Sequence, residues 1–114
     1  MKKVCLEDVK PYAAPGHFDM VAMRLSGKDE TGAEKFWVGL SHFLPGGGAE
    51  YGYEDNPNEK FYWVLEGNLT VKSKTEQYTI GPNEGIFLGP NEGREIINKT
   101  NLPASMLVIV QFPE

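Results

Sequence analysis

The chain has one cysteine and two histidines among its 114 residues, and each scarcity excludes a class of site. The single thiol, Cys5, cannot close an internal disulfide or complete a thiolate metal cage. The two histidines, His17 and His42, cannot supply a three-histidine metal site. Basic residues are also few: 11 Lys and Arg stand against 16 Asp and Glu, for a net charge of −5. We therefore expect no nucleic-acid partner, because such proteins present a basic face.

Long apolar runs are absent as well. No stretch of 18 or more apolar residues occurs, so we expect no transmembrane helix and no membrane partner. Charged residues interrupt the first eight positions, which lack the apolar run of a secretory signal. Together with the lone cysteine, these features predict a cytoplasmic protein.

A sustained helical period is missing too. Thirteen glycines and eight prolines divide the chain into short segments that are rich in aromatic and β-branched residues, as strands are. We predict strands over residues 18–25, 35–44, 51–53, 60–66, 68–73, 76–80, 85–88, 94–98 and 104–112. Many short strands without intervening helices predict an all-β fold, a single sandwich or barrel of antiparallel strands.

Three short motifs refine this organisation. Glu66-Gly67-Asn68 predicts a tight hairpin turn, with glycine supplying the positive φ. Gly46-Gly47-Gly48, which no helix follows, is interpreted as a loop between strands. Residues 1–16 are predicted to be an irregular N-terminal segment in which Val4-Cys5-Leu6 forms an edge or exchanged strand. Residues 17–114 then make one barrel domain.

Two longer stretches carry a family resemblance. Residues 61–71, Phe61-Tyr62-Trp63-Val64-Leu65-Glu66-Gly67-Asn68-Leu69-Thr70-Val71, and residues 78–90 resemble the first-motif hairpin and the strand–turn–strand of the cupin family. Leu44-Pro45-Gly46-Gly47 is similar to the loop before the first cupin motif. The resemblance covers roughly residues 36–112. It implies a double-sheet, jelly-roll barrel and a homodimer.

The metal-ligand positions of the resemblance are replaced. Cupins bind a divalent metal through three histidines and a glutamate, and the matching positions here hold Tyr51, Tyr53, Lys60 and Arg94. Of the second motif, this chain keeps only Asn98. Arginine has no lone pair to donate, and two cations repel a dication. We therefore expect no metal and no other cofactor.

The resemblance brings Lys60 and Arg94 together, and their charges then need compensation. At an effective dielectric constant near 20, two unit charges about 4 Å apart repel by roughly 4 kcal/mol. Three outcomes stay open. One is an internal carboxylate, for which Glu50, Glu59, Glu92 and Glu95 are near in sequence. Another is a bound anion held by the arginine with tyrosine hydroxyls. In the third, both side chains reach the barrel mouth and meet solvent or surface carboxylates.

Aromatic side chains crowd the central strands, and strand alternation sends about half of them inward. They form either core and dimer packing or a wall that stacks on a ligand; the set is Phe36, Trp37, Phe43, Phe61, Tyr62 and Trp63. His42 stands in one of these strands. It is either a hydrogen-bonded core or rim residue or, if it points into the barrel, a ligand contact. His17 is interpreted as a surface-loop residue.

Three functions follow. The first is binding of a small anionic molecule, a carboxylate or sugar acid, without metal, by Arg94, Lys60, Tyr51, Tyr53, His42 and Tyr62. The second is a metal-independent isomerase, epimerase or lyase acting on a small oxo acid, with Lys60, Tyr51 and Tyr53 in acid–base roles. The third is a metal-dependent oxygenase with ligands elsewhere in the chain. The sequence does not decide whether the protein is an enzyme.

Overall fold

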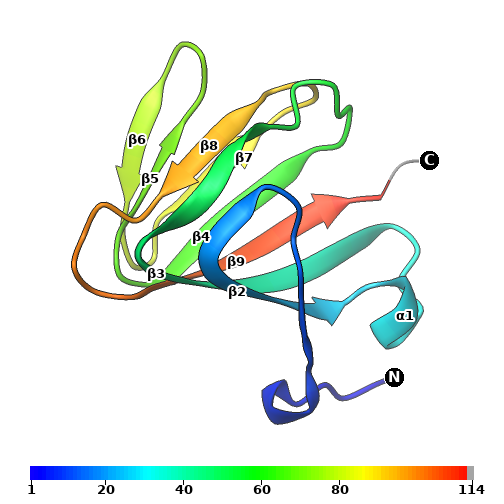
Figure 1. Cartoon of the computed structure of the whole chain (residues 1–114). Coiled ribbons are helices and arrows are strands. Elements are labelled where there is room, and N and C mark those ends of the chain that lie inside the picture. Colours follow the sequence, from blue (N-terminus) through cyan, green and yellow to red (C-terminus); the bar gives the residue numbers. More distant parts are fainter. Residues whose placement is uncertain (113–114) are drawn as a thin grey trace.

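The computed structural model describes residues 1–112, which form a nearly closed β-barrel with two single-turn helices (Figure 1). The helices are η1 (Leu6–Asp8), a 3₁₀ turn, and α1 (Lys28–Thr31). The strands are β1 (Pro11–Tyr12), β2 (His17–Ser26), β3 (Phe36–Gly52), β4 (Lys60–Glu66), β5 (Leu69–Lys72), β6 (Gln77–Ile80), β7 (Gly85–Leu88), β8 (Arg94–Ile97) and β9 (Ala104–Gln111). Within residues 1–112, no helix is long and apolar enough to cross a membrane.

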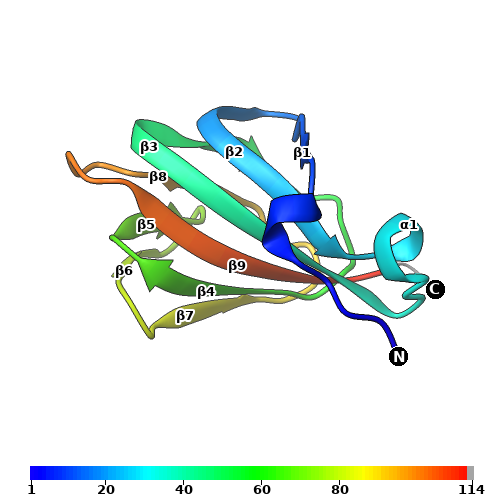
Figure 2. The ribbon, with the colours of Figure 1, turned by 90° about the horizontal axis from the view of Figure 1, so that it is seen from below.

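All strand pairs are antiparallel. The strand order is β6-β5-β8-β3-β9-β4-β7, with β2 also paired to β3 and β1 added to the edge of β2. Seen from below, β7, β4, β9, β3 and β2 lie side by side, and β5, β6 and β8 curve round behind them (Figure 2). The prediction of an all-β, double-sheet barrel is confirmed.

The prediction of a glycine-rich loop at residues 46–48 is wrong. A single strand, β3, runs through it; its first half pairs with β2 and β9, and its second half pairs with β8 and the start of β2. A Cβ on Gly47 would collide with the Asp19 carbonyl, and one on Gly48 would collide with the Ile96 carbonyl. The glycines are therefore needed for close backbone approach inside a bent strand.

Of the other local predictions, one is confirmed and one is wrong. Gly67 has φ +76°, which confirms the tight turn between β4 and β5. The strand expected at Val4-Cys5-Leu6 is not formed, because η1 begins at Leu6. Instead Pro11–Tyr12 pairs with β2. The single turn of α1, between β2 and β3, was not predicted.

Side chains of β3 alternate between the barrel interior and its outer face. Trp37, Gly39, Ser41 and Phe43 line the interior, so the even-numbered residues point outward. The buried core contains Tyr62, Val64, Leu69, Val71, Ile96, Ala104 and Met106, with others.

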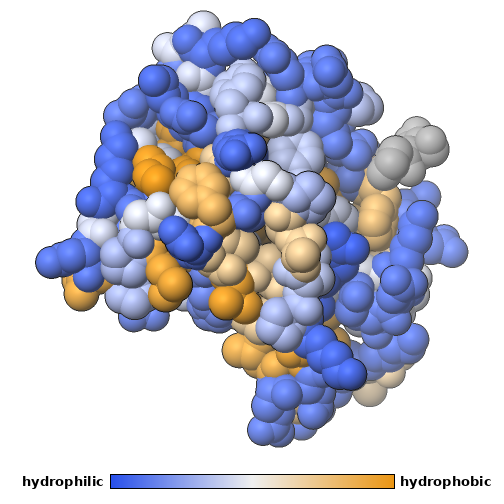
Figure 3. Space-filling view, viewed as in Figure 1, coloured by the Kyte–Doolittle hydropathy of each residue, from blue (hydrophilic) through white to orange (hydrophobic). Residues whose placement is uncertain are grey.

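The outer face of the larger sheet is unusually apolar. One cross-strand row contains Met23, Leu40, Leu107 and Trp63, and the next contains Val38, Ile109, Phe61 and Phe87. Figure 3 shows a different side of the molecule, the one seen in Figure 1, where apolar side chains gather near the middle and hydrophilic ones surround them.

Candidate functional site

A cavity of about 100 Å³ lies inside the barrel, between the inward faces of β2, β3, β4, β8 and β9. Its position follows from one cross-strand row in which Arg24, Gly39, Val108 and Tyr62 stand side by side. Gly39 has no side chain of its own, and the Trp37 indole lies over it, because a Cβ there would be 2.9 Å from the ring. The lining consists of Tyr12, Ala14, Pro15, His17, Ala22, Arg24, Trp37, Gly39, Ser41, Phe43, Tyr53, Tyr62, Ile96, Met106 and Val108.

Two cations are buried beside this cavity. Lys60 from β4 and Arg94 from β8 are each only 3% exposed. Within residues 1–112, neither lies within ion-pair distance of a carboxylate, and the ion pair present there joins Lys74 to Glu54 at the surface. The expectations of an internal glutamate partner and of solvent-exposed cations are therefore both wrong.

The ring of Tyr53 compensates in part for the missing anion. Its centroid lies 4.8 Å from Lys60 Nζ and 4.6 Å from Arg94 Cζ, so one aromatic ring contacts both cations. Tyr53 follows directly after β3 and has φ +68°, a left-handed conformation that is strained for a bulky side chain. The ring thus lines the cavity and contacts both cations, neither of which is among the residues that line the cavity.

Tyr62 connects the cations to the cavity. Arg94 Nε–H donates a 2.8 Å hydrogen bond to Tyr62 Oη, and Arg94 Nη1–H donates a 3.3 Å bond to the Glu50 carbonyl. Burial raises the pKa of Tyr62, although nearby Arg94 opposes the shift. The hydroxyl therefore stays protonated at neutral pH. Because its oxygen accepts from Arg94, its own proton is free for an acceptor in the cavity.

Lys60 is the more easily neutralised of the two cations. Burial lowers its pKa, and the charge of Arg94 lowers it further. Its amino group donates one long hydrogen bond, 3.4 Å, to the Asn58 carbonyl. An amine in this environment is closer to its nucleophilic, uncharged form than a lysine in water is.

His17 was interpreted as a surface-loop residue, and that interpretation is wrong. It is half-buried, opens β2 and lines the cavity. Its Nδ1–H donates to the Pro15 carbonyl at 2.8 Å, which leaves Nε2 as the acceptor nitrogen of the neutral ring. Burial lowers the pKa of His17. The hydrogen bond to the Pro15 carbonyl opposes this shift, and the charge of Arg94 adds to it. A register shift between Phe18 and Met20 changes the alternation of β2 and turns His17 inward, which sequence spacing does not reveal.

His42 and Tyr51 are not brought to the cavity. His42 is an even-numbered residue of β3, so it faces the outside, where Nδ1 hydrogen-bonds Ser105 Oγ at 2.7 Å. Tyr51 is exposed and packs against Gly93 in a surface depression near Asn56. Of the predicted site residues, the structure brings together Tyr53, Lys60, Tyr62 and Arg94.

A metal does not fit the positions that bind it in cupins. Those positions hold two tyrosines and two buried cations, which repel a dication. Within residues 1–112, no three His, Cys, Asp or Glu side chains are grouped so as to hold a metal ion. Asn83 and Asn91 take glycine positions of the second motif and adopt the positive φ expected there, 63° and 61°. The motif backbone is thus kept while its ligands are lost.

A small antiparallel double-sheet barrel with this motif backbone defines a cupin-type protein. Residues 39–110 match the family model described as Cupin domain, and the chain belongs to that family. It is 36% identical over 113 residues to a Mycobacterium tuberculosis protein named beta-D-galactosidase, covering 99% of this chain and 96% of that one.

Solved structures show the same fold. A polyketide cyclase from Streptomyces resistomycificus has a TM-score of 0.84 at 23% identity, covering 97% of this chain and 79% of that chain. A sugar phosphate isomerase of the cupin superfamily from Silicibacter pomeroyi has a TM-score of 0.79 at 21% identity, covering 98% and 76%. Likeness at these identities concerns the fold alone.

Proposed function

We propose that the barrel binds a small organic anion, a carboxylate or sugar acid, with Arg94 and Lys60 as its cationic contacts and without a metal. The observation that carries this proposal is that both cations are 3% exposed and neither has a carboxylate partner within residues 1–112. Burying a charge without a counter-charge is costly. The Tyr53 ring offsets about 0.5–2 kcal/mol for each cation, and an anion offsets more.

The neighbouring side chains suit this ligand. Tyr62 has a free hydroxyl proton at the cavity wall, and Arg94 stands directly behind it. Tyr53 lines the cavity and contacts both cations, which do not line it, so we expect an anion to reach them after the Tyr53 side chain rotates away. His17 Nε2 and Ser41 offer further polar contacts, while Trp37 and Phe43 supply apolar and aromatic wall.

Sugar-derived acids are the favoured subclass. The names of one relative, a galactosidase, and of one structural neighbour, a sugar phosphate isomerase, support it. Glycoside hydrolysis usually needs two carboxylates beside the scissile bond. None of the described residues that line the cavity carries a carboxylate. The cavity therefore suits an acidic sugar derivative better than hydrolysis of a neutral glycoside.

The lowered pKa of Lys60 favours a second function, metal-independent isomerase, epimerase or lyase chemistry on an oxo acid. The Lys60 nitrogen lone pair would add to the carbonyl carbon, and loss of water would leave an imine. Borohydride then reduces the C=N bond to a stable amine. With pyruvate as probe, mass spectrometry should find the added mass on Lys60. Labelling spread over exposed lysines, and unchanged in Lys60→Met, would contradict this function.

The apolar rows on the outer face support a further proposal, that the protein acts as a homodimer. Phe61 and Phe87 of these rows are exposed, and an exposed apolar patch on a sheet is commonly covered by a second subunit. We also propose a cytoplasmic location, for the reasons given by the sequence.

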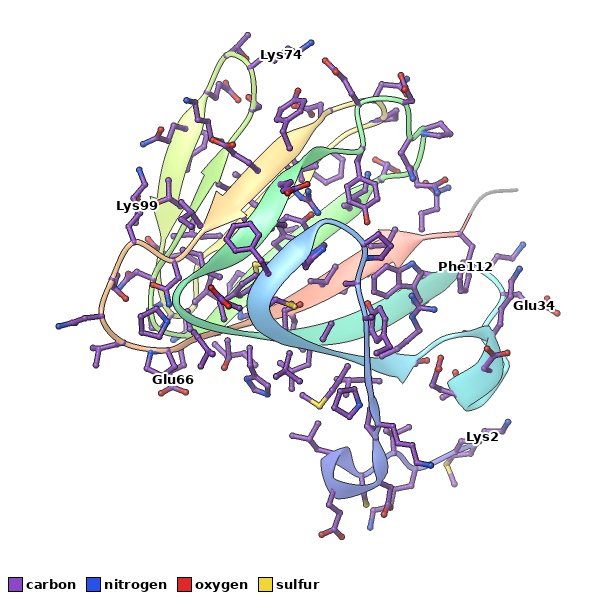
Figure 4. All side chains as sticks on the ribbon, viewed as in Figure 1. Lys2, Glu34, Glu66, Lys74, Lys99 and Phe112 are labelled. Carbon is purple, nitrogen blue, oxygen red and sulfur yellow. The ribbon has the colours of Figure 1, made fainter. Side chains whose placement is uncertain are left out.

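Ligand-induced stabilisation tests the anion site. A ligand at about 100 times its dissociation constant stabilises the native state by about 2.7 kcal/mol. For a domain of this size that raises Tm by about 10 °C. Thermal shifts are measured with carboxylates, sugar acids and inorganic phosphate. Arg94→Met should abolish the shift, and Lys99→Met, at an exposed position far from the barrel interior, should keep it (Figure 4). No shift with any probe, or an equal shift in Arg94→Met, would contradict the proposal.

A further inference from the structure

A third cation, Arg24 of β2, lines the cavity. Its guanidinium carbon lies 4.5 Å from the centroid of the Trp37 ring and 5.0 Å from that of the Tyr12 ring. Gly39 makes this arrangement possible, because a Cβ there would lie 2.9 Å from the Trp37 ring. The indole therefore lies across the strand beside Arg24. Two aromatic faces hold the guanidinium in place.

One donor of the Arg24 side chain has no partner in the described part of the chain. Its Nε–H is buried and has no acceptor within residues 1–112. Acidic side chains of Asp8, Asp29 and Glu30 share an outer groove with it, yet none lies within ion-pair distance. A buried N–H without an acceptor is rare in folded proteins and calls for an explanation.

Arg24 stands opposite the proposed anion site. Arg24, Gly39, Val108 and Tyr62 occupy one row across β2, β3, β9 and β4. Three strand spacings separate its ends, about 14 Å along the curved sheet. Arg24 lies at one end of this row, and Tyr62 with its bonded Arg94 lies at the other.

We propose that Arg24 binds a second acidic group, so that the ligand is a dianion: a short dicarboxylate or a sugar acid with a carboxylate at each end. This inference rests on the proposed anion site at Arg94 and Lys60. One acidic group contacts Arg94, Lys60 and the Tyr62 hydroxyl. The other accepts from the Arg24 guanidinium. The body of the ligand would lie in the cavity between them, which Val108 and Met106 also line.

A purely structural role for Arg24 explains only part of this arrangement. Arg24 joins β1 to β3 through Tyr12 and Trp37, and that explains the position of its guanidinium. It does not explain why the buried Nε–H of Arg24, a residue that lines the cavity, has no acceptor in the described part of the chain.

Matched pairs of acids test the inference by isothermal titration calorimetry. The pairs are succinate with butyrate, adipate with hexanoate, and galactarate with galactonate; each differs in whether the second end is acidic. For the pair whose length fits the cavity, wild-type protein should bind the dianion at least about tenfold more tightly than the monoanion. One charge-assisted hydrogen bond supplies a factor of this size. Arg24→Met should remove that preference and keep the affinity for the monoanion. Arg94→Met should lose both acids, and Lys99→Met should match wild type.

The outcomes separate this inference from the proposed function. If wild type binds monoanions and dianions equally, or if Arg24→Met keeps the preference, the role of Arg24 is wrong while the Arg94 site stands. If no acid binds, the proposed function itself fails. Should Arg24→Met not fold, Arg24→Lys keeps the charge but not the planar fork. It should retain a preference of reduced size, and a preference equal to that of wild type would contradict guanidinium recognition.

Discussion

Replacing Lys60 with methionine should make the protein more stable and a poorer anion binder. Methionine keeps the length and apolar stem of lysine and removes one of the two buried cations. Lys60 Nζ and Arg94 Cζ lie 4.8 and 4.6 Å from one ring centroid. Their charges are therefore less than about 10 Å apart, and two unit charges at about 10 Å repel by roughly 1.7 kcal/mol at a dielectric constant near 20.

The lost interactions are smaller than this repulsion. The contact of Lys60 with the Tyr53 ring contributes about 1 kcal/mol, and the 3.4 Å hydrogen bond to Asn58 is too long to add much. Relief of charge burial acts in the same direction as relief of repulsion. We expect the free energy of unfolding at pH 7 to rise by about 1 kcal/mol, and Tm by roughly 4 °C.

The pH dependence gives an independent check. Because the folded-state pKa of Lys60 lies below its ordinary value of 10.5, the unfolded chain holds this proton to higher pH than the folded chain does. Wild-type stability therefore gains from Lys60 as pH rises from the folded-state pKa toward 10.5. The stability advantage of Lys60→Met should be largest at neutral pH and shrink toward pH 10.5.

Urea denaturation of wild type, Lys60→Met and the exposed control Lys99→Met between pH 7 and 10 measures both effects. A loss of more than about 2 kcal/mol in Lys60→Met would refute the reasoning, since it would mean that Lys60 has a strong partner in the folded protein. Unchanged stability together with unchanged anion binding would contradict the idea that Lys60 belongs to the site.

The remaining predictions concern assembly, metal content and a buried asparagine. Light scattering should give about twice the 12.7 kDa chain mass, and Phe87→Glu on the apolar outer face should lower it to the monomer value; a wild-type monomer would contradict the dimer. Elemental analysis should find no stoichiometric transition metal, and one ion per chain would contradict the conclusion that a metal does not fit these positions. Asn98→Leu should lower the free energy of unfolding by about 3–5 kcal/mol, because fully buried Asn98 donates to three carbonyls and accepts from Thr100. Urea denaturation measures this loss, and a loss under about 1 kcal/mol would contradict the prediction.

Strand positions could be predicted because the signal is local. Breakers at glycine and proline, and β-branched or aromatic runs between them, located most of the strands within a few residues. Residues 46–48 failed because three successive glycines have the same local signature in a loop and in a bent strand. What distinguishes them here is the approach of the Asp19 and Ile96 carbonyls, and those contacts come from distant parts of the chain.

The candidate site was predicted in part for a similar reason. Lys60 and Arg94 were identified because they replace ligands at fixed motif positions, and the resemblance implied that they converge. His17 and Arg24 have no such motif. They reach the cavity through the register shift in β2 and the pairing of β2 with β3, neither of which the sequence displays. Both interpretations of His42 stayed open because alternation fixes which residues share a face but does not say which face is inside. Its hydrogen bond to Ser105 agrees with a rim residue, and the ligand contact is wrong.

The bent strand β3 also limits how the cavity opens. Its two halves belong to opposite walls of the barrel, and it hydrogen-bonds to β2, β8 and β9. Neither wall can swing away alone without breaking that shared strand, so the walls should exchange their amide hydrogens as one cooperative unit, slowest in β3 and β9. A ligand that enters would then have to displace side chains that line the cavity, and Tyr53 and His17 are among them. Faster amide exchange around these two residues than in the walls would mark the route by which ligand reaches the cavity.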